Sequence, residues 1–413
     1  MNRPRSIPTT DGTKLSGRSG TRGLGSSWIR TAIGAQATLL VGMGLGRFSY
    51  TPMVPALIDN GAVSADQAGW IGAANLGGYL VGGLAVPWLL QRAAAPLILR
   101  GCLVLSFAAL AASTVPAGFA WLLACRLLLG VAVAVMMILS IASVTAAAPA
   151  QHLGKAAGIA FTGVGLGIFF SAAALPLLLS YGLLWAWVGT AAIGAVGLGL
   201  GLWGWSGGGD APPPVRNDPL PTHLSADAAR LVAAQGLFSV GLVPHSIYWV
   251  DYLVRGLGWS IAEGGAQWTL FGLGAVLGTI AWGRLADRIG FSPALTLVFA
   301  SLAVGIALPV LAPGPLTVVL SSLMVGAQPG LSAVIAGRAQ RAIGSGSMLG
   351  LWRWMVLAVG TGQLVAGYGL VALFNARGSY TEVFLVGATA MAGGAVLAFG
   401  LRHTEAGRVS TSR

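Results

Sequence analysis

Charged residues are scarce in this chain of 413 residues, of which only 8% are Asp, Glu, Lys or Arg. A soluble domain carries roughly a quarter charged residues, so the scarcity excludes an ordinary soluble protein. Cysteine is scarcer still, because Cys102 and Cys125 are the two that the chain contains. They define neither a disulfide framework nor a metal-ligand spacing. His, Cys and carboxylate side chains do not cluster within any apolar stretch, which argues against an intramembrane enzyme.

Apolar residues make up 55% of the chain, and the mean hydropathy is +0.80. A hydrocarbon core about 30 Å thick is crossed by about 20 apolar residues in a helix. The sequence therefore predicts an all-α integral membrane protein with twelve transmembrane helices. The predicted spans are residues 31–58, 67–90, 96–115, 119–147, 153–180, 183–205, 229–256, 264–284, 292–311, 315–337, 346–374 and 380–401.

The formal net charge of +12 follows the predicted topology. With the amino terminus placed in the cytoplasm, 18 of the 23 Lys and Arg residues fall in inner segments, and only Arg255 and Arg377 fall in outer loops. The positive-inside rule predicts this asymmetry for a chain with both termini inside. We therefore expect a multi-pass protein of a bacterial inner membrane with both termini cytoplasmic, and no binding to nucleic acid.

One long polar stretch interrupts the apolar spans, and it reads "SGGGDAPPPVRNDPLPTHLSAD" over residues 206–227. Its Gly and Pro content predicts a linker, with six spans on each side. The tail over residues 1–27 is rich in Arg, Ser and Gly and is expected to be disordered. The predicted organisation is a disordered cytoplasmic tail over 1–27, a six-helix bundle over 28–205, a cytoplasmic linker over 206–227, a second six-helix bundle over 228–401 and a cytoplasmic tail over 402–413.

The two halves align at an offset of 196 residues. "RLLLG" from Arg126 matches "SLMVG" from Ser322, and the same offset places Gly82 on Gly278. Six spans is an even number, so the second half enters the membrane in the same orientation as the first. Such a parallel repeat is typical of transporters, whose substrate site lies between the halves near the midplane.

One loop makes the pattern more specific, because "GRLADRIG", residues 283–290, resembles the loop signature Gly-x-Leu-Ala-Asp-Arg-x-Gly of the major facilitator superfamily. "GRFSYTPMVP" from Gly46 and "VPHSIYWVDYLVRGLG" from Val243 resemble its YbfB/YjiJ-like branch. The first-half copy of the loop, "PWLLQRAA" from Pro87, departs from the signature because Gln91 stands in place of the acid. The resemblance implies two pseudo-symmetric six-helix bundles and transport by alternating access.

The same loop predicts a gate formed by Gly283, Asp287 and Arg288, with Arg92 as the first-half counterpart of Arg288. A carboxylate can dock on a helix amino terminus, where unpaired amide groups carry partial positive charge. We expect Asp287 to dock at Gly154, where the fifth span begins, and so to close the inner side. The alternative is a plain turn between two helices with basic residues at the interface.

Two arginines within the spans, Arg47 and Arg126, are expected at one depth, very roughly 10 Å below the outer face at about 1.5 Å per residue. Because the guanidinium fork matches a carboxylate, the pair predicts a site for a small organic anion. Alternatively, Arg47 pairs within the protein, and Arg126 has a structural or gating role. The other predicted substrate-binding residues are Tyr50, Asn75, Tyr79, Gln267, Gln328 and Gln363.

His245 and Asp251 are the titratable candidates for coupling transport to protons. Asp251 precedes Arg255 by four residues, so a local helical ion pair is the alternative. His245 could equally be a neutral histidine packed among aromatic side chains, and the substrate itself could carry the proton.

Together these features predict a secondary active transporter for a small organic anion, proton symport being one option. We expect a monomer in the lipid bilayer, without enzymatic activity, metal or cofactor. A drug or metabolite efflux antiporter of the same fold is the nearest alternative, although buried positive charge suits cationic drugs poorly. A membrane sensor that transports nothing is the alternative of another class.

Overall fold

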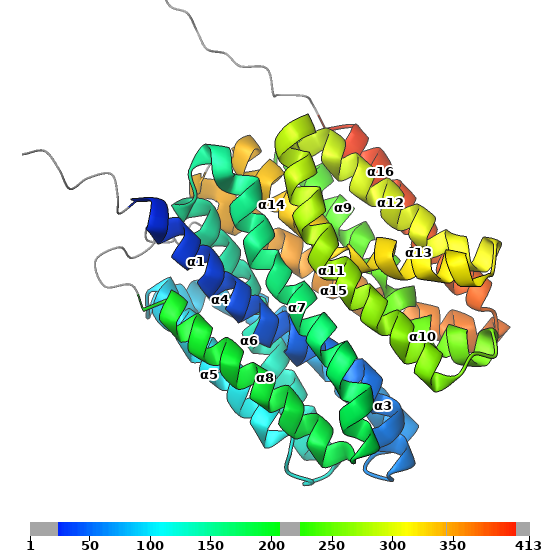
Figure 1. Ribbon diagram of the computed structural model, residues 1–413. Helices are drawn as coiled ribbons and strands as arrows, with labels where there is room; N and C mark the ends of the chain where they lie inside the picture. The colour runs from blue at the N-terminus through cyan, green and yellow to red at the C-terminus, as the bar shows by residue number, and fades with distance from the viewer. Residues whose placement is uncertain (1–23, 207–223, 344, 402–413) are drawn as a thin grey trace, which may run out of the picture.

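The computed structural model describes residues 24–206, 224–343 and 345–401, and within these ranges it contains helices and turns but no strands. The first six crossings form one bundle, drawn in blue to green in Figure 1. Its elements are α1 (Leu24–Leu39), a π-helical segment η1 (Leu40–Leu45), α2 (Gly46–Phe48), α3 (Tyr50–Asp59), α4 (Ala65–Leu90), α5 (Ala95–Ala112), α6 (Phe119–Ala147), a 3₁₀ turn η2 (Ala150–His152), α7 (Leu153–Ser180) and α8 (Leu183–Gly204).

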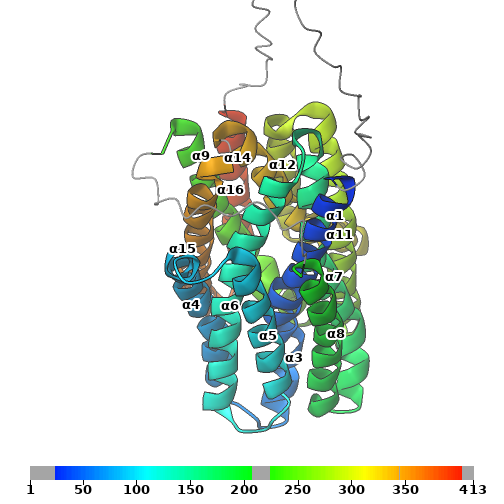
Figure 2. The same cartoon turned by 90° about the vertical axis from the view of Figure 1, so that its left-hand side faces the viewer.

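The remaining six crossings form the second bundle, drawn in green to red. Its elements are α9 (Ala226–Val243), the π-helical segment η3 (Pro244–Tyr248), α10 (Trp249–Asp251), a second π-helical segment η4 (Tyr252–Gly256), α11 (Ile261–Ile289), α12 (Phe291–Leu311), α13 (Pro315–Gly326), α14 (Pro329–Ile343), α15 (Ser345–Arg377) and α16 (Tyr380–Phe399). The start of α1 and the end of α16 lie at one end of the molecule, called the inner end below (Figures 1 and 2).

The predicted fold class is confirmed: the described residues form an all-α membrane protein, and eleven of its helices are long and apolar enough to span a bilayer. The first predicted span is not among these eleven, and η1 interrupts it after α1. Helix α1 begins at Leu24, before the predicted boundary at residue 28. The predicted tails and linker lie wholly or largely outside the described residues.

Three predicted spans are interrupted rather than continuous. In the first span, the glycines of η1 let it approach α7 closely, and a side-chain carbon at Gly44 would lie 2.6 Å from the Cα of Gly167. In the seventh and tenth spans the interruptions fall at Pro244 and Pro329, which lack the backbone N–H that continues an α-helix. Irregular backbone at membrane depth is tolerated where protein buries it or where it lines a cavity.

The duplication is visible in the close approach of matching helix pairs. A side chain at Gly78 of α4 would overlap the Leu127 carbonyl of α6, and one at Gly274 of α11 would meet the Leu323 carbonyl of α13. Each residue of the second pair lies 196 positions after its counterpart. The same holds for the contact of Gly130 with Asn75 and that of Gly326 with Phe271. The structure therefore repeats, contact by contact, the offset seen in the sequence.

The two bundles meet along α7 and α11, which lie side by side across the molecule (Figure 1). Near the inner end, a side chain at Gly154 of α7 would overlap the carboxylate of Asp287 on α11. Near the outer end, one at Gly265 would lie 3.8 Å from Pro176. Small residues allow this approach because packing, rather than the hydrophobic effect, holds helices together in lipid.

Large apolar side chains cover the outward faces of the spans. Leu177, Leu316 and Val396 are each more than 60% exposed, which would be costly in water but suits contact with lipid tails. Several polar residues discussed below, among them Arg126 and His245, are instead buried inside the protein.

Candidate functional site

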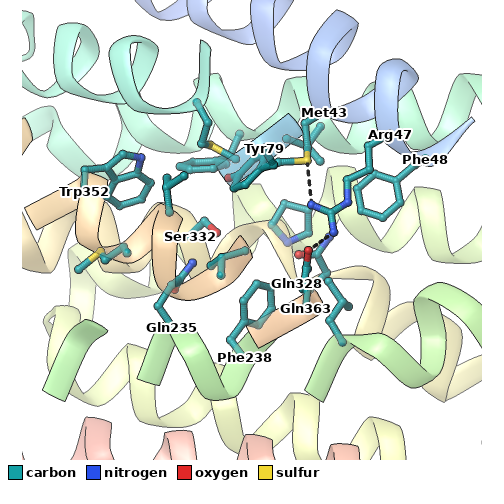
Figure 3. A pocket seen from close by; sticks show the side chains of 18 residues that line it. Met43, Arg47, Phe48, Tyr79, Gln235, Phe238, Gln328, Ser332, Trp352 and Gln363 are labelled. Atoms are coloured by element: carbon teal, nitrogen blue, oxygen red, sulfur yellow. Dashed lines mark hydrogen bonds between the residues drawn. The ribbon is translucent and has the colours of Figure 1, made fainter. Parts of the chain in front are cut away.

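A cavity lies between the two bundles, and both contribute to its walls (Figure 3). About 550 Å³ of this region is not occupied by protein atoms, a volume that includes space open to solvent. Its polar lining consists of Arg47, Tyr79, Gln235, Gln328, Ser332 and Gln363. The apolar lining includes Met43, Phe48, Met137, Phe161, Val164, Phe238, Leu242, Pro329, Trp352, Met355, Val356 and Val359.

Arg47 lies on α2, just after η1, and its guanidinium reaches into the cavity (Figure 3). It donates a hydrogen bond to the Gln363 side-chain oxygen, which belongs to α15 of the opposite bundle. The Met43 sulfur lies 4.0 Å from the guanidinium, and the Tyr79 ring centroid lies 6.0 Å from its central carbon. Among the described residues no carboxylate pairs with Arg47, so its charge faces the cavity with only neutral partners.

Arg126 occupies a different place, although it was predicted at the same depth. Its side chain is 4% exposed and donates hydrogen bonds to the backbone carbonyls of Gly46 and Arg47, the latter at 3.3 Å. The guanidinium also lies 4.6 Å from the centroid of the Tyr50 ring. Arg126 therefore holds the backbone that carries Arg47, and it is not one of the residues that line the cavity.

Tyr50 and Asn75, predicted as walls of the site, support α4 and α6 instead. The Tyr50 hydroxyl donates to the Ala68 carbonyl at 2.9 Å, and the Asn75 amide donates to the Arg126 carbonyl at 3.2 Å. Gln267 also lies outside the cavity lining, where it accepts a hydrogen bond of 2.9 Å from Ser322. The structure thus brings Arg47, Tyr79, Gln328 and Gln363 together in one lining and leaves Arg126, Tyr50, Asn75 and Gln267 outside it.

Gln235 of α9 lines the cavity and was missed by the sequence reasoning. Its side chain is 5% exposed, its amide oxygen is buried without a hydrogen-bond partner, and its amide nitrogen points into the cavity (Figure 3). The available signal was a lone glutamine inside an apolar span. Ser332 and Trp352 were also missed, because nothing in the sequence shows which face of α14 or α15 looks toward the first bundle.

His245 lies in the interior of the second bundle and is 1% exposed. Its ring stacks on Trp249 with centroids 4.4 Å apart, and its Nε2 atom lies 2.9 Å from the Ser321 hydroxyl. The Nδ1 atom has no hydrogen-bond partner. His245 therefore packs among aromatic rings and does not line the cavity.

Asp251 lies near the outer end and forms an ion pair with Arg255, the local pairing considered as the alternative. It also accepts a hydrogen bond of 2.6 Å from the Tyr380 hydroxyl. These contacts link α10, η4 and α16 within the second bundle, and they leave Asp251 outside the cavity lining.

The predicted inner contact is present, because Asp287 lies against Gly154 at the start of α7. Gly283 is close as well, since a side-chain carbon there would lie 3.3 Å from the Gly154 carbonyl oxygen. Arg288 is exposed at the end of α11. Arg92 does not reach across the bundles: it donates to the Trp88 carbonyl at 3.1 Å and lies over the ring of the same tryptophan.

Arg338 forms a buried ion pair with Asp227 that was not predicted from the sequence. It is 3% exposed and contacts the Asp227 carboxylate at 3.1 Å and the Ser292 hydroxyl at 2.9 Å. These bonds tie α14 to α9 and α12 at the inner end. Arg338 is thus neutralised within the second bundle, whereas Arg47 is not.

Groups of three or more His, Cys, Asp or Glu residues that could hold a metal ion are not found within the described ranges. The cavity lining, as far as it is described, contains no Asp, Glu, His or Lys. The lining offers one cation, three carboxamides, two hydroxyls and the indole N–H group of Trp352, and its other side chains are apolar.

The sequence profile of a family described as "Uncharacterised MFS-type transporter YbfB" matches residues 39–399. No curated protein sequence matches the chain. Among solved structures, the human organic anion transporter MFSD10 is similar with a TM-score of 0.67 at 16% identity, over 92% of this chain and 100% of that one. The E. coli fucose:proton symporter FucP is similar with a TM-score of 0.68 at 15% identity, over 90% of this chain and 98% of that one.

A bacterial homologue of the iron transporter ferroportin, solved in an outward-facing state, gives a TM-score of 0.66 at 17% identity, over 90% of this chain and 98% of that one. At these identities the likeness concerns the fold.

Proposed function

Because the chain belongs to the YbfB-like family of major facilitator transporters, we propose that it carries a small organic anion across a bacterial inner membrane by alternating access, with Arg47 as the charge partner. In this proposal the two bundles rock about the cavity, so that the anion meets Arg47 from either side of the membrane in turn.

The unneutralised guanidinium of Arg47 is the observation that carries the proposal. A cation at membrane depth is costly unless it is paired or faces a water-filled cavity. Its described partners are the neutral side chains of Gln363 and Met43. A carboxylate can accept two parallel hydrogen bonds from a guanidinium and supply the missing charge, whereas a cationic drug would be repelled. The fold accommodates such substrates, since MFSD10 is described as an organic anion transporter.

Coupling by His245 or Asp251 stays a prediction. Each is held by contacts within the second bundle, His245 with Ser321 of α13 and Asp251 with Tyr380 of α16, and neither lines the cavity. With no carboxylate or imidazole in the described lining, a proton carried by the substrate is the simpler arrangement.

Closure of the inner side is the second part of the proposal. The Asp287 carboxylate lies at the amino terminus of α7, where a helix favours negative charge by about 0.3–1 kcal/mol. We assign Asp287, Gly283 and Gly154 to a contact that forms when the cavity faces outward and breaks when it faces inward. Arg288 and Arg92 then serve as basic anchors at the inner membrane surface.

The proposal is tested with purified protein in proteoliposomes. A thermal-shift screen of carboxylates against amines identifies an anion that stabilises the protein, and counterflow of that anion is then measured. Losing a hydrogen bond to a charged group costs about 1.5–3 kcal/mol, so Arg47→Gln should weaken anion binding about 10- to 150-fold. Arg377→Gln is the matched control, because it removes a positive charge from an exposed ion pair with Glu382 far from the cavity.

Stabilisation by amines alone would overturn the anion preference. Undiminished counterflow in Arg47→Gln would remove Arg47 from the site. Absence of counterflow with every stabilising ligand would favour a sensor over a transporter.

A further inference from the structure

We propose that the substrate is a monocarboxylate with an apolar, ring-sized body and a hydrogen-bonding group at its far end, which Gln235 recognises. This inference rests on the proposed function and names the substrate class of the same cavity. It follows from the number of cations in the lining, the nature of the walls and the unpaired amide of Gln235.

The number of cations sets the charge of the substrate. Arg47 is the only cationic side chain in the described lining. Arg126 is held by the carbonyls of Gly46 and Arg47 and is turned away from the cavity. A second carboxylate on the substrate would therefore be buried without a counter-charge, which costs far more than burying a neutral group. The cavity favours monoanions over dianions.

The side chains of the cavity walls determine the chemical character of the central part of the substrate, called its body here. Between the Arg47 end and the Trp352 end of the cavity, most of the apolar side chains are aromatic rings and thioethers (Figure 3). Aromatic faces and methionine sulfur pack well against flat apolar groups. A sugar in the same place would leave several hydroxyl groups without partners, and each would lose its hydrogen bonds to water. The body that fits is apolar and about the size of one ring.

Gln235 determines which group the substrate needs at the end of the cavity away from Arg47. Its amide is almost fully buried, its oxygen lacks a partner, and its nitrogen points into the cavity on the side away from Arg47 (Figure 3). Buried polar groups in proteins are nearly always hydrogen-bonded, and an amide N–H group that points into a cavity (Figure 3) can donate to a ligand there. The Ser332 hydroxyl lines the same side and is 8% exposed. A hydroxyl oxygen on the substrate can accept a hydrogen bond from the Gln235 amide nitrogen that points into the cavity (Figure 3).

Benzoate, 3- and 4-hydroxybenzoate, terephthalate and benzamide test the three requirements separately. We expect thermal stabilisation by the three monocarboxylates, and binding of the better hydroxybenzoate to be about tenfold tighter than that of benzoate, the value of one hydrogen bond. Terephthalate, a dianion, and benzamide, which is neutral, should bind at least tenfold more weakly than benzoate.

Gln235→Leu should abolish the preference for the hydroxybenzoate, so that the ratio of its affinity to that of benzoate falls from about ten to about one. Gln267→Leu is the matched control, since it replaces another buried glutamine that lies outside the lining, and it should keep the preference. Because the readout is a ratio of affinities within one variant, a general loss of stability does not mimic the result.

The outcomes separate the two proposals. Equal binding of terephthalate and benzoate, or a hydroxyl preference that survives Gln235→Leu, would overturn this inference while the anion proposal stands. Binding of short aliphatic carboxylates with no binding of any ring compound would overturn the apolar body in the same way. If no carboxylate binds at all, the proposed function itself fails.

Discussion

At the residue scale, two arginines that look equivalent in the sequence have different surroundings. Arg47 projects into the cavity, and Arg126 holds the carbonyls beside it. Depth follows from the rise per residue and can be read from the sequence, but the direction of a side chain around the helix depends on the local winding. The π-helical turn η1 lies immediately before α2 and changes that winding, so the sequence predicted the shared depth and not the difference.

Arg126→Gln is expected to weaken the fold more than the preference for anions. It would leave the carbonyls of Gly46 and Arg47 without their donors, and each buried unpaired acceptor costs about 1–3 kcal/mol of unfolding free energy. Thermal unfolding and the ratio of carboxylate to amine binding are the measurements, with Arg47→Gln for comparison. A lost anion response at unchanged stability would instead show that Arg126 binds the substrate directly.

At the element scale, hydropathy located the eleven helices that are long and apolar enough to cross a bilayer, because about 20 apolar residues per helix is a strong constraint. Most of the predicted span ends lie within a few residues of the ends of the helices, as for 119–147 and α6. The interruptions at η1, η3 and the start of α14 were not predicted. Gly44, Pro244 and Pro329 mark them in the sequence, but whether such residues break a helix depends on what packs against it.

The site was predictable only in part for the same reason. Tyr79, Gln328 and Gln363 were identified as polar residues on cavity spans, and they do line it. Gln235 was not predicted to line the cavity, and Gln267 was predicted at the site but lies outside the described lining, because a glutamine in an apolar span can face either the cavity or a neighbouring helix.

Gly78→Ala is expected to destabilise the first bundle, and Gly77→Ala provides a control one residue away in the same helix. A side-chain carbon at Gly78 would overlap the Leu127 carbonyl, whereas one at Gly77 would meet nothing within 4 Å. Overpacking of this kind costs about 1–3 kcal/mol. Thermal unfolding in detergent measures the difference, and equal melting temperatures for the two variants would mean that α4 and α6 do not need this contact.

At the scale of the whole molecule, the bundles make contact near both ends of the long seam between α7 and α11. At the inner end the seam includes the Asp287 carboxylate against Gly154, and near the cavity the Arg47–Gln363 hydrogen bond also joins the two bundles. A substrate that takes Arg47 away from Gln363 removes one of these links. Rocking of the bundles then also requires the inner contact between Asp287 and Gly154 to break.

Asp287→Asn should slow counterflow several-fold without changing protein abundance. The amide keeps the shape of the carboxylate but loses the charge that favours a helix amino terminus by about 0.3–1 kcal/mol. Glu382→Gln is the control, because it removes an exposed negative charge at the opposite end of the molecule. Transport at the wild-type rate in Asp287→Asn would reject the gate and leave the contact as a simple turn.

The duplicated glycine contacts have a consequence for how the chain is made. Gly78 and Gly130 meet partners that all lie before residue 132. The packing of α4 against α6 can therefore form while the ribosome is still translating the second half, since domains generally fold as units during synthesis. The second bundle repeats the process with its own copy of the contacts. The contacts between the bundles, including the α7–α11 seam and the walls of the cavity, form once the second-half helices that take part in them have been made.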